Sequence, residues 1–206
     1  MFRDRAEAGQ RLGEWLRHLR GRPDLEVLGI ARGGAPVAAE VAGVLRVPWT
    51  VIAVRRLISS ACPGLTMGAV AEGGYVSAVG NRAMVSTNVD TAQVERMAVR
   101  LRQGEPLPEL ADRTVILVDD GAVTGATARA ACRAVRAADA ARIILAVPLI
   151  APCTVAGVCD CADEVVRVVA IPRIERLGDY YRKYPSITEA DVVTLLATDG
   201  IDAATA

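Results

Sequence analysis

The stretch that most constrains the fold of this chain is Val115–Thr127, which reads Val-Ile-Leu-Val-Asp-Asp-Gly-Ala-Val-Thr-Gly-Ala-Thr. Four apolar residues run directly into two adjacent carboxylates and then into a turn of small and hydroxyl-bearing residues. Ala128–Ala138 follows, rich in Ala and Arg and free of Gly and Pro, which predicts a helix. An apolar strand followed by a helix is typical of a buried parallel strand and its crossover. The stretch therefore predicts an α/β fold with Asp119 and Asp120 at the carboxyl end of a sheet, where such folds bind ligands.

The turn after the acid pair has the chemistry of a phosphate site. It stands at the N-terminus of the predicted helix, where free N–H groups, the helix dipole and two hydroxyls favour a phosphate monoester. The two carboxylates would repel a phosphate, but they can accept hydrogen bonds from a diol or hold a cation that bridges to the ligand. A phosphate beside a diol indicates a sugar phosphate. The turn contains no Lys and the chain has no G-x-G-x-x-G, so neither a Walker A loop nor the dinucleotide fingerprint is present.

Val115–Thr127 resembles the phosphoribosyl pyrophosphate (PRPP) signature of the type I phosphoribosyltransferases: four apolar residues, two acids, two mostly apolar residues and a Thr/Gly-rich loop. The resemblance implies that Asp119 and Asp120 hold the ribose 2′- and 3′-hydroxyls. It also implies that the 5′-phosphate lies on a loop formed by Val123, Thr124, Gly125, Ala126 and Thr127. The alternative interpretation is an ordinary strand–turn–helix unit with acidic residues at its mouth.

A second strand–glycine turn–helix unit lies earlier in the chain. Glu26–Ala31 predicts a short strand, Arg32-Gly33-Gly34 a tight turn, and a helix runs from about Pro36, which suits a first helical turn, to Leu45. By itself the turn is a weak signal. Beside the signature, it resembles the pyrophosphate loop of the same family, with Arg32, Gly33 and Gly34 against the leaving group and a cis peptide bond between Ala31 and Arg32.

The next predicted strand, Trp49–Val54, ends in Arg55 and Arg56. Two arginines at the carboxyl end of a strand, facing one crevice, could contact pyrophosphate because guanidinium groups pair well with phosphate oxygens. A solvated strand end explains them equally well.

Residues 57–89 form a long excursion inside the domain, and such excursions are usually functional. Met67–Ala71 and Tyr75–Val79 flank Glu72-Gly73-Gly74, which predicts a β-hairpin. The family has a hairpin and a flexible loop in this position, and the loop closes over the reacting centre. Met67–Gly74 also resembles an uncharacterised bacterial branch of the family.

The two ends of the chain are expected to form a small hood, as the resemblance implies. Residues 4–20 predict an amphipathic helix through Leu12, Trp15, Leu16 and Leu19, and we place His18 on its surface. Residues 171–196 contain three of the four tyrosines. Tyr180 or Tyr181 could stack on a nucleobase, or these rings could instead anchor a C-terminal helix over Thr188–Leu196.

The resemblance implies one domain over residues 1–206, with a core of about 24–170 and a frayed tail at 197–206. The implied fold is a Rossmann-like parallel sheet of about five strands flanked by helices, with the hairpin and flexible loop at one side and the hood above. Hydrophobic residues make up 52% of the chain but aromatic residues only 3%, so Ala, Val and Leu must fill the core.

Charge and cysteine content narrow the partners and the compartment. The formal net charge is zero, which argues against a nucleic acid or an anionic membrane as the main partner. No apolar signal segment or membrane-spanning run is visible. Five cysteines without a disulfide pattern favour a reducing cytoplasm. We interpret Cys153, Cys159 and Cys161 as buried thiols, because their spacing is not that of a zinc site.

The implied reaction displaces pyrophosphate from C1 of PRPP by a nitrogen nucleophile, with Mg²⁺ as cofactor. Asp119, Asp120 and Arg32 are its catalytic candidates, and any metal contact of Asp119 and Asp120 is mainly through PRPP. Hypoxanthine-guanine relatives carry an Asp where this chain has Val123, so nucleotide salvage with those purines is disfavoured. Two alternatives stay open: a PRPP- or nucleotide-binding regulator without catalysis, and ribosylation of an acceptor that is not a nucleobase. The acceptor and the oligomeric state, including a homodimer, are not specified.

Overall fold

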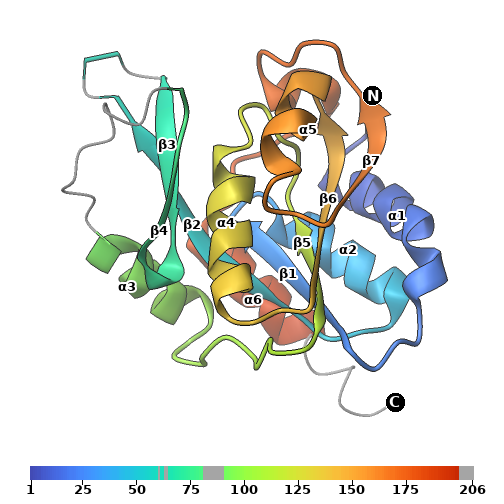
Figure 1. Cartoon of the computed structure of the whole chain (residues 1–206). Helices are drawn as coiled ribbons and strands as arrows, with labels where there is room; N and C mark the ends of the chain where they lie inside the picture. Colours follow the sequence, from blue (N-terminus) through green and yellow to red (C-terminus); the bar gives the residue numbers. More distant parts are fainter. Residues whose placement is uncertain (60, 63–64, 81–90, 200–206) are drawn as a thin grey trace.

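The protein is described from a computed structural model that covers residues 1–206 except 60, 63–64, 81–90 and 200–206 (Figure 1). The strands are β1 (Leu25–Ala31), β2 (Trp49–Ile58), β3 (Thr66–Ala71), β4 (Tyr75–Ala78), β5 (Thr114–Val118), β6 (Arg142–Ile150) and β7 (Glu164–Ala170). The helices are α1 (Arg5–Trp15), α2 (Ala35–Leu45), α3 (Thr91–Leu101), α4 (Ala126–Ala137), α5 (Pro152–Val158) and α6 (Glu189–Asp199). Three short 3₁₀ turns are η1 (Arg17–Leu19), η2 (Glu72–Gly74) and η4 (Leu177–Tyr180).

The strands of the described residues form one sheet in the order β4-β3-β2-β1-β5-β6-β7. Five neighbouring strands of the sheet, β2-β1-β5-β6-β7, are parallel, as predicted. The other two, β3 and β4, pair antiparallel with their neighbours. The predicted hairpin therefore does not stand apart, because it continues the sheet beyond β2. Every residue of β1 and of β5 is buried, which is expected where helices cover both faces of a parallel sheet.

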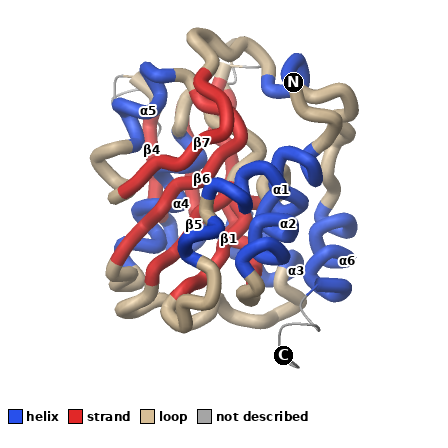
Figure 2. Tube along the Cα trace, turned by 90° about the vertical axis from the view of Figure 1, so that its right-hand side faces the viewer, coloured by secondary structure: helices blue, strands red, loops and turns tan. Residues whose placement is uncertain are grey.

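Helices cover the two faces of the sheet unequally (Figures 1 and 2). On one face lie α1, α2, α3 and α6, whose apolar side chains share a core cluster with Ile116 and Val118 of β5. On the other face lie α4 and α5, which share a second cluster with Val115 and Leu117. The alternation follows from the two-residue period of a strand, so the sheet separates the two clusters.

The sheet reverses its winding direction between β1 and β5. The crossover from β1 leads through α2 to β2 on one side, whereas β5 lies on the other side of β1 and continues to β6. The loops after β1 and β5 therefore lead to helices on opposite faces of the sheet. In open α/β sheets ligands bind at this switch point, outside the carboxyl ends of the strands.

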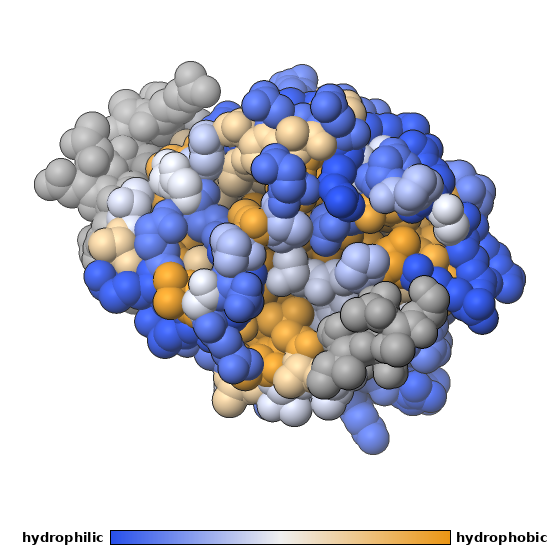
Figure 3. All heavy atoms as spheres, turned by 90° about the horizontal axis from the view of Figure 1, so that it is seen from below, coloured by the Kyte–Doolittle hydropathy of each residue, from blue (hydrophilic) through white to orange (hydrophobic). Residues whose placement is uncertain are grey.

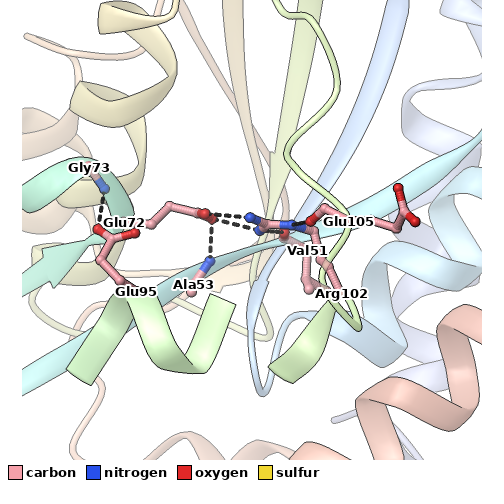
Figure 4. A network of polar contacts seen from close by, with 7 residues as sticks. All are labelled: Val51, Ala53, Glu72, Gly73, Glu95, Arg102 and Glu105. Atoms are coloured by element: carbon pink, nitrogen blue, oxygen red, sulfur yellow. Dashed lines mark hydrogen bonds and ion pairs between the residues drawn. The ribbon is translucent and has the colours of Figure 1, made fainter. Parts of the chain in front are cut away.

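A buried ion pair attaches the hairpin to the rest of the sheet (Figure 4). Arg102, just after α3, donates to both carboxylate oxygens of Glu72 at 2.9 and 2.6 Å and to the carbonyl of Val51 at 3.0 Å. Glu72 also accepts from the backbone N–H of Ala53 at 2.9 Å, and Glu95 accepts from the N–H of Gly73 at 2.7 Å. Because η2 connects β3 to β4, these bonds fix the turn of the hairpin against β2 and α3.

The two chain ends pair with each other. Phe2 forms a parallel bridge with Tyr181, with backbone bonds of 2.9 Å from Phe2 N to Tyr180 O and from Arg182 N to Phe2 O. Phe2 and Tyr181 pack with Ile174 in a third apolar cluster. This pairing brings the first residues of α1 and the segment before α6 to the carboxyl edge of β5.

Several predicted boundaries differ from the observed ones. Trp15 was expected on the core face of the first helix but is 62% exposed, because α1 ends there and the chain turns into η1. His18 is exposed, as predicted. The last helix extends to Asp199 rather than Leu196, so the predicted frayed tail at 197–206 is wrong for 197–199, which are helical. The rest of that tail, 200–206, lies outside the described residues, as do parts of the excursion at 60, 63–64 and 81–90. Within the part of the chain that the structure describes, no helix is long and apolar enough to cross a bilayer.

Candidate functional site at the carboxyl edge of the sheet

The two neighbouring acids after β5 have different hydrogen-bond partners. Asp119 lies on the α4 side: its carboxylate accepts from the N–H of Asp120 at 2.9 Å and lies 3.4 Å from the Thr127 hydroxyl. Burial, and after it the charge of Asp120, raises the pKa of the Asp119 carboxyl well above its ordinary value. Asp119 is thus a buried, weakly compensated acid beside the predicted phosphate loop.

Asp120 lies on the α1 side and is bonded to the chain ends through one carboxylate oxygen and its backbone carbonyl. Its Oδ2 accepts from Arg5 Nε at 2.8 Å and from the Tyr184 hydroxyl at 2.7 Å, and its backbone carbonyl accepts from the Tyr181 hydroxyl at 2.6 Å. The Arg5 guanidinium lies 3.8 Å from the centre of the Tyr184 ring and also donates to the carbonyl of Pro185 at 2.8 Å. The side chains of Arg5 and Asp120 are each 8% exposed. This is a desolvated ion pair that joins α1, the signature and the C-terminal segment.

The predicted phosphate loop is an open helix start. Gly125 has φ +69° and precedes the first residue of α4, which places the N-terminal N–H groups of that helix beside the loop. A Cβ atom at Gly125 would lie 2.9 Å from Val158, so glycine is required there for space as well as for conformation. The Thr154 hydroxyl donates to the carbonyl of Val123 at 2.6 Å and anchors the loop. Thr124 is exposed, Val123 and Thr127 are half-buried, and Gly125 and Ala126 are buried, so the loop reaches the surface at Thr124.

The loop after β1 presses against the signature. The peptide bond between Ala31 and Arg32 is cis, as the resemblance implied. A Cβ atom on Gly33 would lie 2.5 Å from Asp120 Oδ2, and one on Gly34 would lie 2.4 Å from the carbonyl oxygen of Val118. The predicted pyrophosphate loop and the acid pair are therefore in direct contact, and both glycines are needed for that approach.

The structure separates the two arginines that were expected to share one crevice. β2 continues through Arg55 and Arg56 to Ile58, so successive side chains point to opposite faces and the shared crevice is wrong. Arg55 lines a hollow of about 200 Å³ between β2, α3 and α6, together with Gln93, Arg96, Met97, Arg100 and Glu189. A hydrogen bond from Arg100 lowers the pKa of Glu189, and the more distant charge of Arg32 adds to the effect. Arg55 therefore faces α3 and α6, and Arg56 points to the opposite face of the sheet.

Tyr181 differs from its predicted role as a stacking residue. It is 5% exposed, its ring lies between Phe2 at 5.5 Å and Tyr184 at 5.0 Å between centroids, and its hydroxyl is bonded to Asp120. No face of the ring is free for a base. Tyr181 anchors the chain ends to each other through Phe2 and Ile174, and not the C-terminal helix, as the alternative interpretation had it. Tyr180 is half-buried and its hydroxyl donates to the carbonyl of Arg173 at 3.2 Å.

Three residues at this edge were missed by sequence reasoning: Arg5, Tyr184 and Arg129. Arg5 falls on the same helical stripe as the buried Ala8 and Leu12. A charged residue on a buried stripe indicates a buried polar partner, and this pattern could have identified Arg5. Tyr184 had no signal of its own. Arg129, in the first turn of α4, donates to the Ser77 hydroxyl at 3.0 Å and to the Ala78 carbonyl at 3.1 Å. It ties the phosphate loop helix to the hairpin, a long-range contact that no local pattern predicts.

A larger groove lies at the opposite, amino-terminal edge of the sheet. Its volume is about 700 Å³, and it contains none of the predicted site residues; its walls come from the starts of β1 and β2, the segment after α3 and the end of α6. Figure 3, the view from below, shows apolar side chains exposed in a hollow on this face. The predicted chemistry is thus at the other end of the strands from this groove.

The donors at the carboxyl edge fit Mg²⁺ only together with a ligand. Among the described residues, no three His, Cys, Asp or Glu side chains are arranged to hold a metal ion. Carboxylate oxygens are suitable donors, and Mg²⁺ commonly binds one or two carboxylates together with substrate phosphates. Asp119 and Asp120 are the carboxylates at this edge that would fit this arrangement. The expectation of buried thiols is wrong for Cys153 and Cys159, which are exposed.

Comparison with known proteins shows the family to which this chain belongs. The family model described as "Phosphoribosyl transferase domain" matches residues 6–171. Two curated proteins of Mycobacterium tuberculosis, from strains CDC 1551 and H37Rv, carry the provisional name phosphoribosyl transferase and are each 37% identical over 207 residues. The alignments cover 95% of this chain but 46% of the relatives, so the chain spans about half their length.

Among solved structures, the protein TT1426 from Thermus thermophilus is 34% identical to this chain and superposes with a TM-score of 0.73. That match covers 95% of this chain and 97% of the Thermus protein. The family match extends from α1 through all seven strands and includes both loops that meet at Asp120. The chain is therefore a member of the type I phosphoribosyltransferase family.

Proposed function

We propose that the protein transfers ribose 5-phosphate from PRPP to a nitrogen acceptor and releases pyrophosphate. The observation that carries this proposal is the convergence of three elements at one edge: the buried acid Asp119, the open N-terminus of α4 at Gly125, and the glycine loop after Arg32, which touches the signature. A diol needs the acid, a monoester phosphate needs the helix N-terminus and a pyrophosphate needs the glycine loop, and one PRPP molecule carries all three groups with the diol in the middle.

Each element has a distinct task in that reaction. The 5′-phosphate binds the N–H groups at the start of α4, and the ribose hydroxyls donate to Asp119. The Arg32 guanidinium and the N–H groups of its loop receive the leaving pyrophosphate. The attacking nitrogen approaches C1 from the opposite side, with inversion, and charge at C1 rises as the bond to pyrophosphate lengthens. Bound Mg²⁺ would supply further compensation of the pyrophosphate charge.

The acceptor is proposed to be neither hypoxanthine nor guanine. Val123 packs in an apolar cluster with Leu177, Tyr180 and Tyr184 of the C-terminal segment, so this position offers no proton acceptor to a purine. Gly121, φ +150°, faces the same segment: a Cβ there would lie 2.5 Å from Leu177. The C-terminal segment therefore covers the acceptor side with apolar groups close to the signature.

A regulator that binds PRPP without turning it over is the second candidate. The observation that favours it is the burial of the acid pair, because Asp119 is 8% and Asp120 5% exposed with a chain-end ion pair already in place. Both functions require that PRPP is bound, but only the first requires that its bond to pyrophosphate is broken.

The test is release of pyrophosphate from PRPP with Mg²⁺, measured against a panel of nucleobases and other nitrogen acceptors, for the wild type and for Asp119→Asn. An enzyme gives acceptor-dependent release that Asp119→Asn reduces at least about 100-fold. A regulator binds PRPP in calorimetry but releases no pyrophosphate with any acceptor. If a folded wild-type protein neither binds PRPP nor releases pyrophosphate, both functions are rejected.

A further inference from the structure

Two successive backbone carbonyls of the phosphate loop are held by side chains from outside the loop. The Thr154 hydroxyl, on α5, donates to the carbonyl of Val123 at 2.6 Å. The Arg129 guanidinium, on α4, donates through Nη1 to the carbonyl of Thr124 at 3.0 Å. A Cβ atom on Gly125 would lie 3.0 Å from Thr154 and 3.2 Å from Arg129, so both side chains lie on the same side of the loop.

A bond to a carbonyl also fixes the N–H group of the next residue, because the C=O and N–H groups of a trans peptide point in opposite directions. The N–H of Thr124 therefore points away from Thr154, and by the same rule the N–H of Gly125 points away from Arg129. Among the described residues, no group accepts a hydrogen bond from either N–H. Successive N–H groups of this kind at the start of a helix form an anion-binding concavity.

The backbone alone does not fix this orientation. Gly125 has φ +69°, and glycine adopts positive and negative φ about equally well, so the peptide group between Thr124 and Gly125 is free to rotate. Rotation would turn the Thr124 carbonyl toward a bound phosphate and the Gly125 N–H away from it. The bond from Arg129 opposes that rotation.

Arg129 is itself held in place and carries a charge that suits an anion. Its Nε donates to the Ser77 hydroxyl at 3.0 Å and its Nη2 to the Ala78 carbonyl at 3.1 Å, so the hairpin fixes the guanidinium. Within the part of the chain that the structure describes, no carboxylate forms an ion pair with Arg129. A cation in the first turn of a helix is disfavoured by the helix dipole, and a phosphate bound at the same turn would compensate its charge.

Resting on the proposed function, we propose that Arg129 and Thr154 are positioning residues for the 5′-phosphate. They hold the carbonyls of Val123 and Thr124 away from the phosphate. The N–H groups of Thr124 and Gly125 then face the phosphate site before the ligand binds, and the charge of Arg129 adds to the effect.

The experiment compares three ligands by calorimetry with Mg²⁺ present: PRPP, ribose 5-phosphate and inorganic pyrophosphate, of which only the first two carry the 5′-phosphate. Arg129→Met should lower the affinity for those two about tenfold or more and change the affinity for pyrophosphate less than about threefold. Thr154→Val removes the hydroxyl at similar volume and should lower the affinity for the same two ligands about threefold or more. Thr154→Ser keeps the hydroxyl and should bind like the wild type.

Arg133→Met is the matched control. Arg133 lies one turn further along α4 and donates to the carbonyl of Val76 in the same hairpin strand, so it holds the hairpin without holding the phosphate loop. This variant should bind all three ligands like the wild type. Circular dichroism establishes that each variant is folded, and Thr154→Val decides the question by itself if Arg129→Met does not fold.

The outcomes separate this proposal from the proposed function. Undiminished affinity for ribose 5-phosphate in a folded Arg129→Met or Thr154→Val protein would overturn the positioning role. Equal losses for all three ligands in Arg129→Met, or the same loss in Arg133→Met, would show that these arginines only hold the hairpin, and would overturn it too. If PRPP is bound but never turned over, transfer fails while the positioning role is still decided by these affinities. A wild-type protein that binds none of the three ligands would reject both.

Discussion

Replacing Gly34 by Ala should displace the Arg32–Gly34 loop, and Gly43 in the helix that follows offers a matched control. A Cβ on Gly34 would lie 2.4 Å from the Val118 carbonyl oxygen and 2.7 Å from that of Ile30, about 1 Å closer than an ordinary contact of 3.4 Å. Both atoms are backbone in the two central strands, so the loop must move and not the sheet. A Cβ on Gly43 meets nothing within 4 Å.

The two substitutions should therefore have opposite effects. Gly34→Ala should lower the free energy of unfolding by about 1–3 kcal/mol, the usual cost of overpacking. A shift of about 1 Å in a group that positions a substrate can cost about 100-fold in rate, so pyrophosphate release should fall steeply. Gly43→Ala should raise the free energy of unfolding by about 0.5–1 kcal/mol, because Ala is a better helix former, and should leave binding unchanged.

Urea unfolding and PRPP calorimetry on both variants measure these effects. Gly34 has φ −72°, which Ala adopts without strain, so the comparison isolates the steric contact. If Gly34→Ala were as stable as Gly43→Ala and bound PRPP like the wild type, the close approach of the loop to β5 would be refuted.

Three further predictions concern burial and charge. Arg102→Met should lower the free energy of unfolding by about 3–5 kcal/mol, because it leaves the Glu72 carboxylate buried and unpaired. In urea unfolding, the double variant Arg102→Met/Glu72→Gln should recover much of that loss. Equal losses in both variants would contradict the ion-pair account. The pKa of Asp119 is raised in the folded state, so the native protein binds this proton more tightly than the unfolded chain, and stability contributed by the protonated form is lost as pH rises above the ordinary value of 3.8. Asp119→Asn should therefore be more stable than the wild type at pH 7 by on the order of 1–3 kcal/mol, with a smaller difference at pH 4, and a variant that is less stable at pH 7 would reverse the sign of this reasoning. Tyr181→Phe should cost about 0.5–1.5 kcal/mol for the lost bond to the Asp120 carbonyl and, because the ring is kept, should leave the KM of any acceptor unchanged; a variant as stable as the wild type in urea would contradict a contribution of this bond.

Local sequence patterns predict those parts of the fold whose conformation is determined by residues close together in the sequence. The strand through Val115–Val118, the glycine turn at Arg32–Gly34 and the helix after Pro36 each carry their own signals, and the five parallel strands follow from them. The continuation of the sheet through β3 and β4 was not predicted, because strand partners are chosen by long-range packing against α4. The signature located Asp119 and the loop at Gly125 for the same reason: hydrophobic run, acids and helix start are adjacent in sequence.

The environment of Asp120 could not be predicted in that way. Arg5 and Tyr184 are 115 and 64 residues away in sequence, and only the pairing of the chain ends brings them to the carboxylate. The error with Arg55 and Arg56 had a different cause. The strand was predicted to end at Val54, and extending it to Ile58 fixes the two side chains on opposite faces. Adjacent residues share a crevice only where the backbone leaves the extended conformation.

Calorimetric titration of PRPP in the presence of Mg²⁺, on the wild type and on Asp119→Asn, tests most directly the claim that the carboxyl edge of β5 is a sugar-phosphate site. We predict saturable binding of PRPP and weaker binding of ribose 5-phosphate by the wild type, and loss of at least about tenfold in PRPP affinity for a folded Asp119→Asn protein. A wild-type protein with no affinity for either compound, or an Asp119→Asn variant with undiminished affinity, would contradict it.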